Sequence, residues 1–319
     1  MTPEFDLIET YFTMPAQKAL LGVGDDCALI GLAAGNELAI STDTLVSGVH
    51  FFADADPFKL GRKALAVNLS DLAAMGAAPR FVTLAITLPS IDPAWLSAFS
   101  RGFFELAEQA GIELIGGDTT RGPLSMTLTV LGEVPTGDAL RRDRAQDGDD
   151  IWVSGSVGGA ALGLKYLQGT VTLKPGVAER ALERLHAPVP RNKIGEKLRG
   201  VANAAIDISD GLVADLAHIC QRSQLAAAIE WALIPISPAL LSVGPDVRMA
   251  CALAGGDDYE LCFTAHERMR EAIAVIASEA GVPLTRIGRM RSGAANVSVL
   301  DERGNELNTA IAGFDHFSV

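Results

Sequence analysis

The chain has 319 residues, of which 49% are hydrophobic and 20% charged, so it is long enough to fill the cores of about two domains. Its formal net charge of −13 would repel nucleic acid and anionic membranes, so we expect neither as a partner. No stretch resembles a membrane-spanning helix. The four cysteines form no Cys-x-x-Cys pair and the first residues lack a signal-peptide pattern, which together favour a reducing, cytoplasmic setting.

Hydrophobic periodicity and turn residues divide the chain into alternating helices and strands. In chain order we predict a helix over 2–12, a strand over 38–42, a helix over 57–76, a strand over 81–88, a helix over 93–110, strands over 112–115, 124–134 and 151–154, a helix entered from the glycine-rich segment 155–163, helices over 176–186 and 190–202, a strand over 204–208, a helix over 211–222, a strand over 226–231, a helix ending before 255, a strand over 260–264, a helix over 266–280, and strands over 284–291 and 296–301. This alternation predicts a layered fold of the α+β or α/β class.

A segment rich in proline, glycine, aspartate and arginine, 135–150, predicts a domain boundary. We expect an N-terminal α/β domain over 1–137 and a C-terminal α/β domain over 138–319. Within the first, residues 124–134 alternate apolar side chains with threonines, so one face of that strand should be half exposed.

Aspartates recur where predicted apolar elements end. The densest case is 204–216, where Asp207, Ser209 and Asp210 crowd a strand-to-helix turn. A helix N-terminus needs only one acidic cap, so the second carboxylate is surplus and suggests a hard cation such as Mg²⁺ with the phosphates it carries. Similar turns occur at 22–26, 41–43, 68–71, 116–120 and 255–260.

Each of these turns taken alone is typical of an ordinary loop, because glycine supplies positive φ and aspartate bonds nearby N–H groups. If they converge, however, their mutual repulsion must be offset by cations, since poorly solvated carboxylates are costly. We therefore predict that one metal site collects Asp26, Asp43, Asp71, Asp118, Asp207 and Asp210.

Three further features have two interpretations each. The glycine-rich loop at 155–159 could lie near phosphates or could allow a helix to pack tightly on the sheet; no P-loop or Gly-x-Gly-x-x-Gly pattern occurs. His50 is either structural or a contact to a substrate phosphate. Arg141, Arg142 and Arg144 form either a solvated charge run or a cationic arm that reaches a nucleotide phosphate.

The order of these motifs resembles the thiamine-monophosphate kinase family, within the superfamily that includes aminoimidazole ribonucleotide synthetase and selenophosphate synthetase. The likeness spans essentially the whole chain and rests on Gly22-Val-Gly-Asp-Asp-Cys-Ala28, Ser41-Thr-Asp-Thr44 with His50, Lys63-Ala-Leu-Ala-Val-Asn-Leu-Ser-Asp-Leu-Ala-Ala-Met-Gly76, Gly116-Gly-Asp-Thr-Thr-Arg-Gly-Pro123, Ile206-Asp-Ile-Ser-Asp-Gly211, Gly256-Asp-Asp-Tyr-Glu-Leu261 and Phe314-Asp-His-Phe317.

The resemblance implies ATP-dependent phosphorylation of thiamine monophosphate to thiamine diphosphate, with several Mg²⁺ ions that bridge the phosphates. It also implies an N-terminal mixed sheet with helices on one face, and a homodimer joined sheet-to-sheet. Carried over by motif, the metal ligands are Asp26, Ser41, Thr42, Asp43, Asp71, Asp118, Asp207 and Asp210; the ATP contacts are Gly117, Asp118, Arg142 and Ser209; and the substrate contacts are His50, Asp257 and Phe314. The chain departs from the family where Asp257 replaces a frequent glutamate and Phe314 replaces tyrosine or tryptophan.

The predicted chemistry needs no general base or covalent nucleophile, because the acceptor phosphate oxygen is already ionised near neutral pH. We expect direct in-line transfer, with Mg²⁺ bringing the two anions together. Two alternatives are open: another ATP-using enzyme of the superfamily, such as a synthetase, and a non-catalytic sensor that binds Mg-ATP without turnover.

Overall fold

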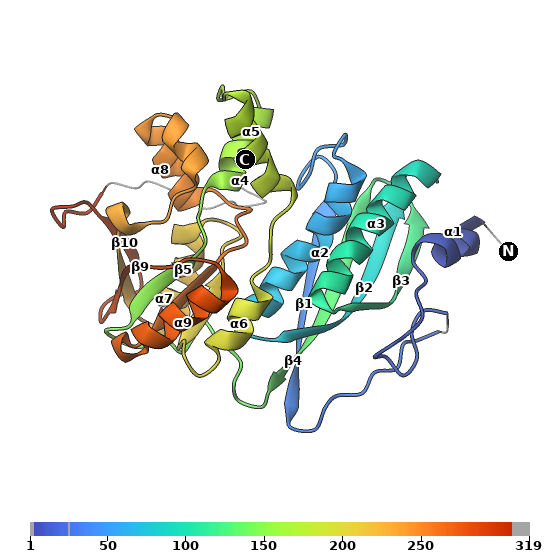
Figure 1. Cartoon of the computed structure of the whole chain (residues 1–319), viewed down its shortest axis with the longest axis horizontal. Helices are drawn as coiled ribbons and strands as arrows, with labels where there is room; N and C mark the ends of the chain where they lie inside the picture. The colour runs from blue at the N-terminus through green and yellow to red at the C-terminus, as the bar shows by residue number, and fades with distance from the viewer. Residues whose placement is uncertain (1–2, 25, 308–319) are drawn as a thin grey trace. The chain divides into compact units, whose positions relative to one another are not determined.

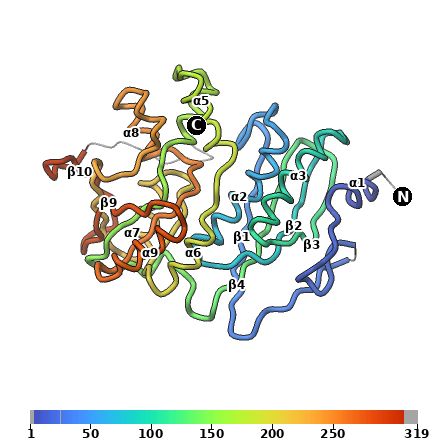
Figure 2. Tube along the Cα trace, viewed as in Figure 1, coloured from blue at the N-terminus to red at the C-terminus, as the bar shows by residue number. Residues whose placement is uncertain are grey.

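Two separate β-sheets organise the chain, each with its own helices (Figure 1). The structure is a computed structural model, and it describes residues 3–24 and 26–307. Its internal contacts divide the chain into two units: unit 1 is Met1–Leu72 with Ala77–Gly137, and unit 2 is Ala73–Gly76 with Asp138–Val319. The trace in Figure 2 follows the chain from unit 1, in blue and green, into unit 2, in green to red.

Unit 1 contains a four-stranded mixed sheet. Its strand order is β1-β4-β2-β3, with β1 Asn36–Val46, β2 Ala78–Leu88, β3 Glu113–Arg121 and β4 Ser125–Pro135. The β4 strand pairs antiparallel with both β1 and β2, whereas β2 and β3 are parallel. The helices of this unit are α1 (Pro3–Tyr11), α2 (Pro57–Ala74) and α3 (Pro93–Ala110), and α3 makes the crossover that a parallel pair requires.

Local sequence explains where α3 begins and how it packs. The Asp92 carboxylate caps the helix by accepting the N–H groups of Ala94 at 2.9 Å and Trp95 at 3.2 Å. Glycines let α2 and α3 touch backbone to backbone: a Cβ added at Gly61 would lie 2.2 Å from the Phe99 carbonyl oxygen, and one at Gly102 would lie 2.0 Å from that of Phe58.

The two faces of this sheet differ. Met126, Leu128 and Val130 of β4 are fully buried on one face, as the alternating pattern predicted. On the other face, the hydroxyls of Thr42 and Thr129 lie 2.9 Å apart and those of Thr44 and Thr127 2.8 Å apart. Thr42, Thr44 and the neighbouring Ile40 are exposed, so this threonine-rich face is open to solvent in the described chain.

Unit 2 is built on a six-stranded sheet. The strand order is β10-β7-β9-β5-β8-β6, with β5 Asp150–Ser154, β6 Ala204–Asp207, β7 Ala226–Glu230, β8 Leu261–Ala265, β9 Leu284–Arg291 and β10 Val297–Leu300. Among the strands of this sheet in residues 3–24 and 26–307, only the β10–β7 pairing is parallel. The helices are α4 Gly159–Leu167, α5 Pro175–His186, α6 Asn192–Leu198, α7 Leu212–Ser223, α8 Pro245–Ala254 and α9 Arg270–Ala280, with short 3₁₀ turns at Trp231–Leu233, Pro238–Ser242 and Glu267–Met269.

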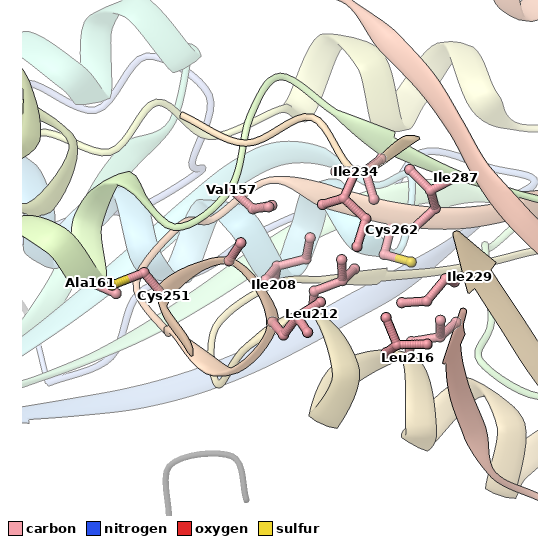
Figure 3. Packing of buried hydrophobic residues seen from close by; sticks show 14 of the residues in the cluster. Val157, Ala161, Ile208, Leu212, Leu216, Ile229, Ile234, Cys251, Cys262 and Ile287 are labelled. Carbon is pink, nitrogen blue, oxygen red and sulfur yellow. The ribbon is translucent and has the colours of Figure 1, made fainter. Parts of the chain in front are cut away.

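Helices cover both faces of this second sheet. Every residue of β5, β6 and β8 is buried, and consecutive side chains point into different cores. Ile206 and Cys262 belong to the same core as Leu212 and Leu216 of α7. Figure 3 shows Cys262, Leu212 and Leu216 in this core. Ala205, Phe263 and Trp152 pack with α6 and α9 in the other core. The predicted architecture of two units that combine mixed sheets with helices is thereby confirmed.

Two strands extend beyond their predicted ends. The prediction that a strand stops at Asp43 was wrong, because β1 continues to Val46 and pairs with β4 along its whole length. Likewise β3 does not end before Gly116 but runs through Asp118 to Arg121 beside β2. Threonines favour strands, so these polar segments continue the sheet rather than turn out of it. Among the described residues, no helix combines the length and apolar character needed to cross a membrane.

Candidate functional site

In unit 1, the structure brings Ser41, Asp43 and Asp71 together. The Ser41 hydroxyl donates to Asp71 Oδ2 at 2.5 Å, which joins the edge strand β1 to the last turns of α2. One helical turn earlier, Asn68 Oδ1 accepts the Asp43 N–H at 3.2 Å, while its Nδ2 donates to the Ala64 carbonyl at 2.9 Å. The buried amide therefore fixes β1 against α2. Ser41 and Asp43 share one face of β1, and Asp71 of α2 meets Ser41 on that face.

Thr42 and His50 take different positions around this group. The Thr42 side chain lies on the opposite face of β1, with Thr129, so only its backbone could join Ser41 and Asp43 as a ligand. His50 follows the strand, and its Nδ1 accepts the Val46 N–H at 3.0 Å. A neutral imidazole with Nδ1 as acceptor carries its proton on Nε2, so this ring is oriented as an Nε2–H donor.

Gly117 and Asp118 lie on β3, the opposite edge of the sheet from β1. Three strand spacings separate the edges, about 14 Å. The register places Asp118 in one row with Ala85, Thr127 and Thr44, which belongs to the threonine-rich face. The structure therefore does not bring Asp118 of this chain to Asp43. Asp26 is exposed in the segment before β1.

Gly117 has a steric reason to be glycine. Its φ is +156°, and an added Cβ would lie 1.8 Å from the Leu84 carbonyl oxygen in the neighbouring strand. No other residue fits where the backbones come this close. The glycine is therefore explained by strand packing, independently of any nucleotide.

In unit 2, the turn between β6 and α7 is shaped by Asp215, which sequence reasoning missed. Its Oδ2 accepts three consecutive backbone N–H groups, from Ser209 at 3.0 Å and from Asp210 and Gly211 at 3.1 Å each. Burial raises the pKa of Asp215 to about 7, against the opposing effect of these donors. The signal in the sequence was an acid in the first turn of α7 on its buried side.

A second loop, 255–260, lies directly against this turn. The Asp257 N–H donates to the Ser209 carbonyl at 2.9 Å and the Tyr259 N–H to the Ile208 carbonyl at 2.8 Å. A Cβ at Gly256 would lie 2.3 Å from the Ser209 oxygen, so glycine permits the contact. Two of the predicted contacts, Ser209 for ATP and Asp257 for substrate, are thus joined through their backbones. Asp207, at the end of β6, is 4% exposed.

The other two acids of this loop serve the scaffold. Asp258 Oδ2 accepts the Gly158 N–H at 2.6 Å at the start of α4, and burial raises the pKa of Asp258 to about 7. Glu260 is fully buried and accepts hydrogen bonds from Ser154 at 2.6 Å, Arg184 at 2.7 Å and Arg191, which uses two nitrogens at 2.6 Å. The side chains of Asp258 and Glu260 thus anchor this loop in unit 2.

The glycine-rich loop at 155–159 is explained by packing. A Cβ at Gly155 would lie 2.2 Å from Glu260 Oε1, and one at Gly158 would lie 2.7 Å from Leu240 and 2.9 Å from the Ala252 nitrogen. The Asp258 carboxylate already occupies the N-terminus of α4. Of the two interpretations, tight packing of a helix on the sheet is the one that these contacts support.

The arginines of the run 141–144 lie at the start of unit 2. Arg141 pairs with Asp143, with its Nε at 2.9 Å and its Nη2 at 2.5 Å from the carboxylate, and this guanidinium lowers the pKa of Asp143. Arg142 is exposed, and its carbonyl accepts the Ser223 hydroxyl at 2.8 Å. Phe314 lies outside the described residues.

No set of three or more His, Cys, Asp or Glu side chains in 3–24 and 26–307 is arranged to hold a metal ion by itself. Magnesium seldom needs such a cage, because it keeps waters and binds one or two carboxylates together with substrate phosphates. The donors present are hydroxyl and carboxylate oxygens. Ser41 pairs with Asp71 in unit 1, and Asp207 and Asp210 flank the turn between β6 and α7 in unit 2. Their chemistry fits Mg²⁺ rather than a softer metal.

Comparison with known proteins places the chain in a class. The family model described as AIR synthase related protein, N-terminal domain, matches residues 24–134, and that described as AIR synthase related protein, C-terminal domain, matches 146–301. The chain belongs to the AIR synthase related protein family. It is 48% identical over 320 residues to thiamine-monophosphate kinase of Escherichia coli (strain K12), which covers 99% of this chain and 98% of that one.

Solved structures with a similar fold include the same kind of enzyme. Thiamine-monophosphate kinase from Stenotrophomonas maltophilia K279a is 50% identical with a TM-score of 0.84, and the match covers 91% of this chain and 92% of that one. AaThiL complexed with AMPPCP and TMP is 29% identical with a TM-score of 0.79, over 90% of this chain and 89% of that one. Within its family the chain therefore belongs to the thiamine-monophosphate kinases, and it is an enzyme.

Proposed function

We propose that this enzyme uses ATP to phosphorylate thiamine monophosphate, forming thiamine diphosphate in the last step of that cofactor's biosynthesis. The observation that carries the proposal is the joined pair of loops in unit 2, where Ser209 and Asp257 are linked by a 2.9 Å backbone hydrogen bond. A kinase needs its nucleotide site and its acceptor site in a fixed position relative to each other. The backbone hydrogen bond between the two loops would fix that position. The AMPPCP and TMP bound by AaThiL support the assignment of the substrates.

Mg²⁺ is proposed to bind at the acidic residues. In unit 1 the ligands are Ser41, Asp43 and Asp71, with the Thr42 backbone, and in unit 2 they are Asp207 and Asp210; Asp26 and Asp118 complete the set. When bound, the cation neutralises phosphate charge. Ser209, Gly117, Asp118 and Arg142 contact ATP, and His50, Asp257 and Phe314 contact thiamine monophosphate.

The transfer itself is proposed to be direct and in-line. The acceptor is a phosphate oxygen that is ionised near neutral pH, so the protein has to orient two anions rather than remove a proton. His50, with Nε2–H as its donor, would bind the acceptor phosphate as a hydrogen-bond donor and not as a base. No residue of the chain is assigned as a covalent nucleophile.

A homodimer joined through the threonine-rich face of unit 1 is proposed as well. Apolar and threonine side chains on that face, including Ile40 at 61% exposure, are open to solvent in the described residues. Asp118 shares this face and lies an entire sheet width from Asp43, so we propose that it serves a site that a second subunit completes. We also propose a cytoplasmic location, where the exposed Cys27 would stay reduced.

The proposal is tested by incubating the protein with Mg-ATP and thiamine monophosphate and quantifying ADP and thiamine diphosphate by chromatography. Equal amounts of the two products are expected, with none from the Asp210→Asn variant or when EDTA removes the cation. ADP without thiamine diphosphate would indicate a different superfamily enzyme. ATP binding without any product would indicate a sensor.

A further inference from the structure

The segment Gly256–Glu260 has an unusual backbone. Asp257 has a φ of +68° and Tyr259 a φ of +50°, the left-handed region that non-glycine residues seldom adopt. Within the described residues one other non-glycine residue, Gln224 at a helix end, has positive φ. Such strain persists only where the surroundings hold it, and it concentrates at functional sites.

Four contacts hold this conformation. The N–H groups of Asp257 and Tyr259 are bonded to the turn at 208–209, while the side chains of Asp258 and Glu260 are anchored in the interior. Asp258 and Glu260, which alternate with Asp257 and Tyr259, are therefore the residues that anchor the segment through their side chains. Asp257 and Tyr259 are half-buried, and the Tyr259 hydroxyl donates to Asp257 Oδ1 at 2.9 Å.

We propose that Tyr259 is a positioning residue: its hydroxyl sets the orientation of the Asp257 carboxylate, and Asp257 in turn recognises the thiamine part of the substrate. This inference rests on the proposed function. A carboxylate can accept a hydrogen bond from an aminopyrimidine and attract a cationic thiazolium ring, and thiamine phosphates carry both groups. The carboxylate of aspartate reaches less far than that of glutamate, so its usefulness depends on a fixed direction.

The geometry makes the role of Tyr259 specific to the thiamine substrate. Its hydroxyl donates to Asp257, whereas the turn that carries Ser209 and Asp210 is shaped by the Asp215 carboxylate. The backbone contact between Tyr259 and Ile208 uses only the Tyr259 N–H, and any residue other than proline at position 259 keeps that N–H. Loss of the hydroxyl should therefore disturb recognition of thiamine monophosphate and leave ATP binding unchanged.

The test is Tyr259→Phe, which removes a single oxygen. We expect KM for thiamine monophosphate to rise about three- to tenfold, the loss that one net hydrogen bond produces. The KM for ATP and kcat should stay within about twofold, since neither depends on this bond. Tyr166→Phe in α4 is the matched control, because it makes the same chemical change elsewhere in unit 2 and should alter neither constant.

A double-mutant cycle decides whether Tyr259 acts through Asp257. In an Asp257→Asn background, Tyr259→Phe should have almost no further effect on the affinity for thiamine monophosphate, measured calorimetrically without ATP. Additive effects in the cycle, an unchanged KM in the single variant, or an equal rise in KM for ATP would each overturn the proposal. Calorimetry does not require turnover, so the cycle decides the role of Tyr259 even if the wild type makes no thiamine diphosphate, a result that would overturn the proposed function separately.

Discussion

Replacing Glu260 by glutamine should destabilise unit 2 strongly. The carboxylate is 0% exposed and faces two guanidinium groups, Arg184 at 26% and Arg191 at 12% side-chain exposure. Glutamine keeps the shape of the side chain but leaves both cations without a charge partner. Breaking a buried ion pair by removing one partner costs about 3–5 kcal/mol. Because both arginines keep some contact with water, we expect about 3 kcal/mol.

Urea denaturation at pH 7.5 measures this loss. Trp152 stacks on Phe263 within unit 2 with ring centroids 6.2 Å apart, so its fluorescence reports that unit. The experiment uses a Trp95→Phe background to remove the tryptophan of unit 1. With a slope of about 2 kcal/mol per molar urea, the transition midpoint should fall by about 1.5 M.

An exposed ion pair in the same unit provides the control. Lys197 and Glu279 lie 2.6 Å apart, but their side chains are 46% and 54% exposed. Glu279→Gln should therefore cost less than about 1 kcal/mol. If Glu260→Gln were as mild as this control, the account of the anchored loop would be wrong.

Three other variants test separate parts of the account. Gly117→Ala should destabilise unit 1 by about 2 kcal/mol or more, because the added Cβ would meet the Leu84 carbonyl oxygen at 1.8 Å; an unchanged melting temperature would contradict this. Asp258 keeps its proton up to about pH 7 in the folded state and loses it near pH 4 when unfolded, so its contribution lowers the free energy of unfolding as pH rises, by about 2.5 kcal/mol between pH 5 and 7.5. Asp215 contributes a fall of the same sign, so urea unfolding of Asp258→Asn at both pH values should show a smaller fall than wild type, and an identical pH dependence would count against it. Asp71→Asn removes the charge that faces Ser41 and should raise the Mg²⁺ concentration for half-maximal activity at least tenfold; activity titrations that coincide with wild type would remove Asp71 from the metal ligands.

Much of the fold was predictable from local patterns. The apolar runs of β5, β6 and β8 indicated strands, and Asp92 with Pro93 marked the start of α3 because its cap is local. The ends of β1 and β3 were not predictable in the same way. They depend on pairing with β4 and β2, and β4 lies about ninety residues further along the chain than β1.

The candidate site, like the fold, was predictable from the sequence only in part. Sequence alone indicated that Ser41, Asp43 and Asp71 belong together. In the structure Ser41 bonds to Asp71, and the Asp43 N–H bonds to Asn68 of the same helix. The sequence could not assign Thr42 and Asp118 to the threonine-rich face, because the register that decides their side is set by distant partners. The sequence also could not identify Asp215, because an acid in the first turn of a helix is typical of an ordinary cap. Its role becomes visible only when the structure shows the three N–H groups that it accepts.

The most direct test of the central claim is a single turnover with [γ-³²P]ATP, thiamine monophosphate and excess enzyme, quenched in acid at millisecond intervals. The account predicts that label moves from ATP to the terminal phosphate of thiamine diphosphate with matched rates, and that no labelled protein accumulates at any time. Labelled protein that forms and decays before the product, or label released only as inorganic phosphate, would contradict it.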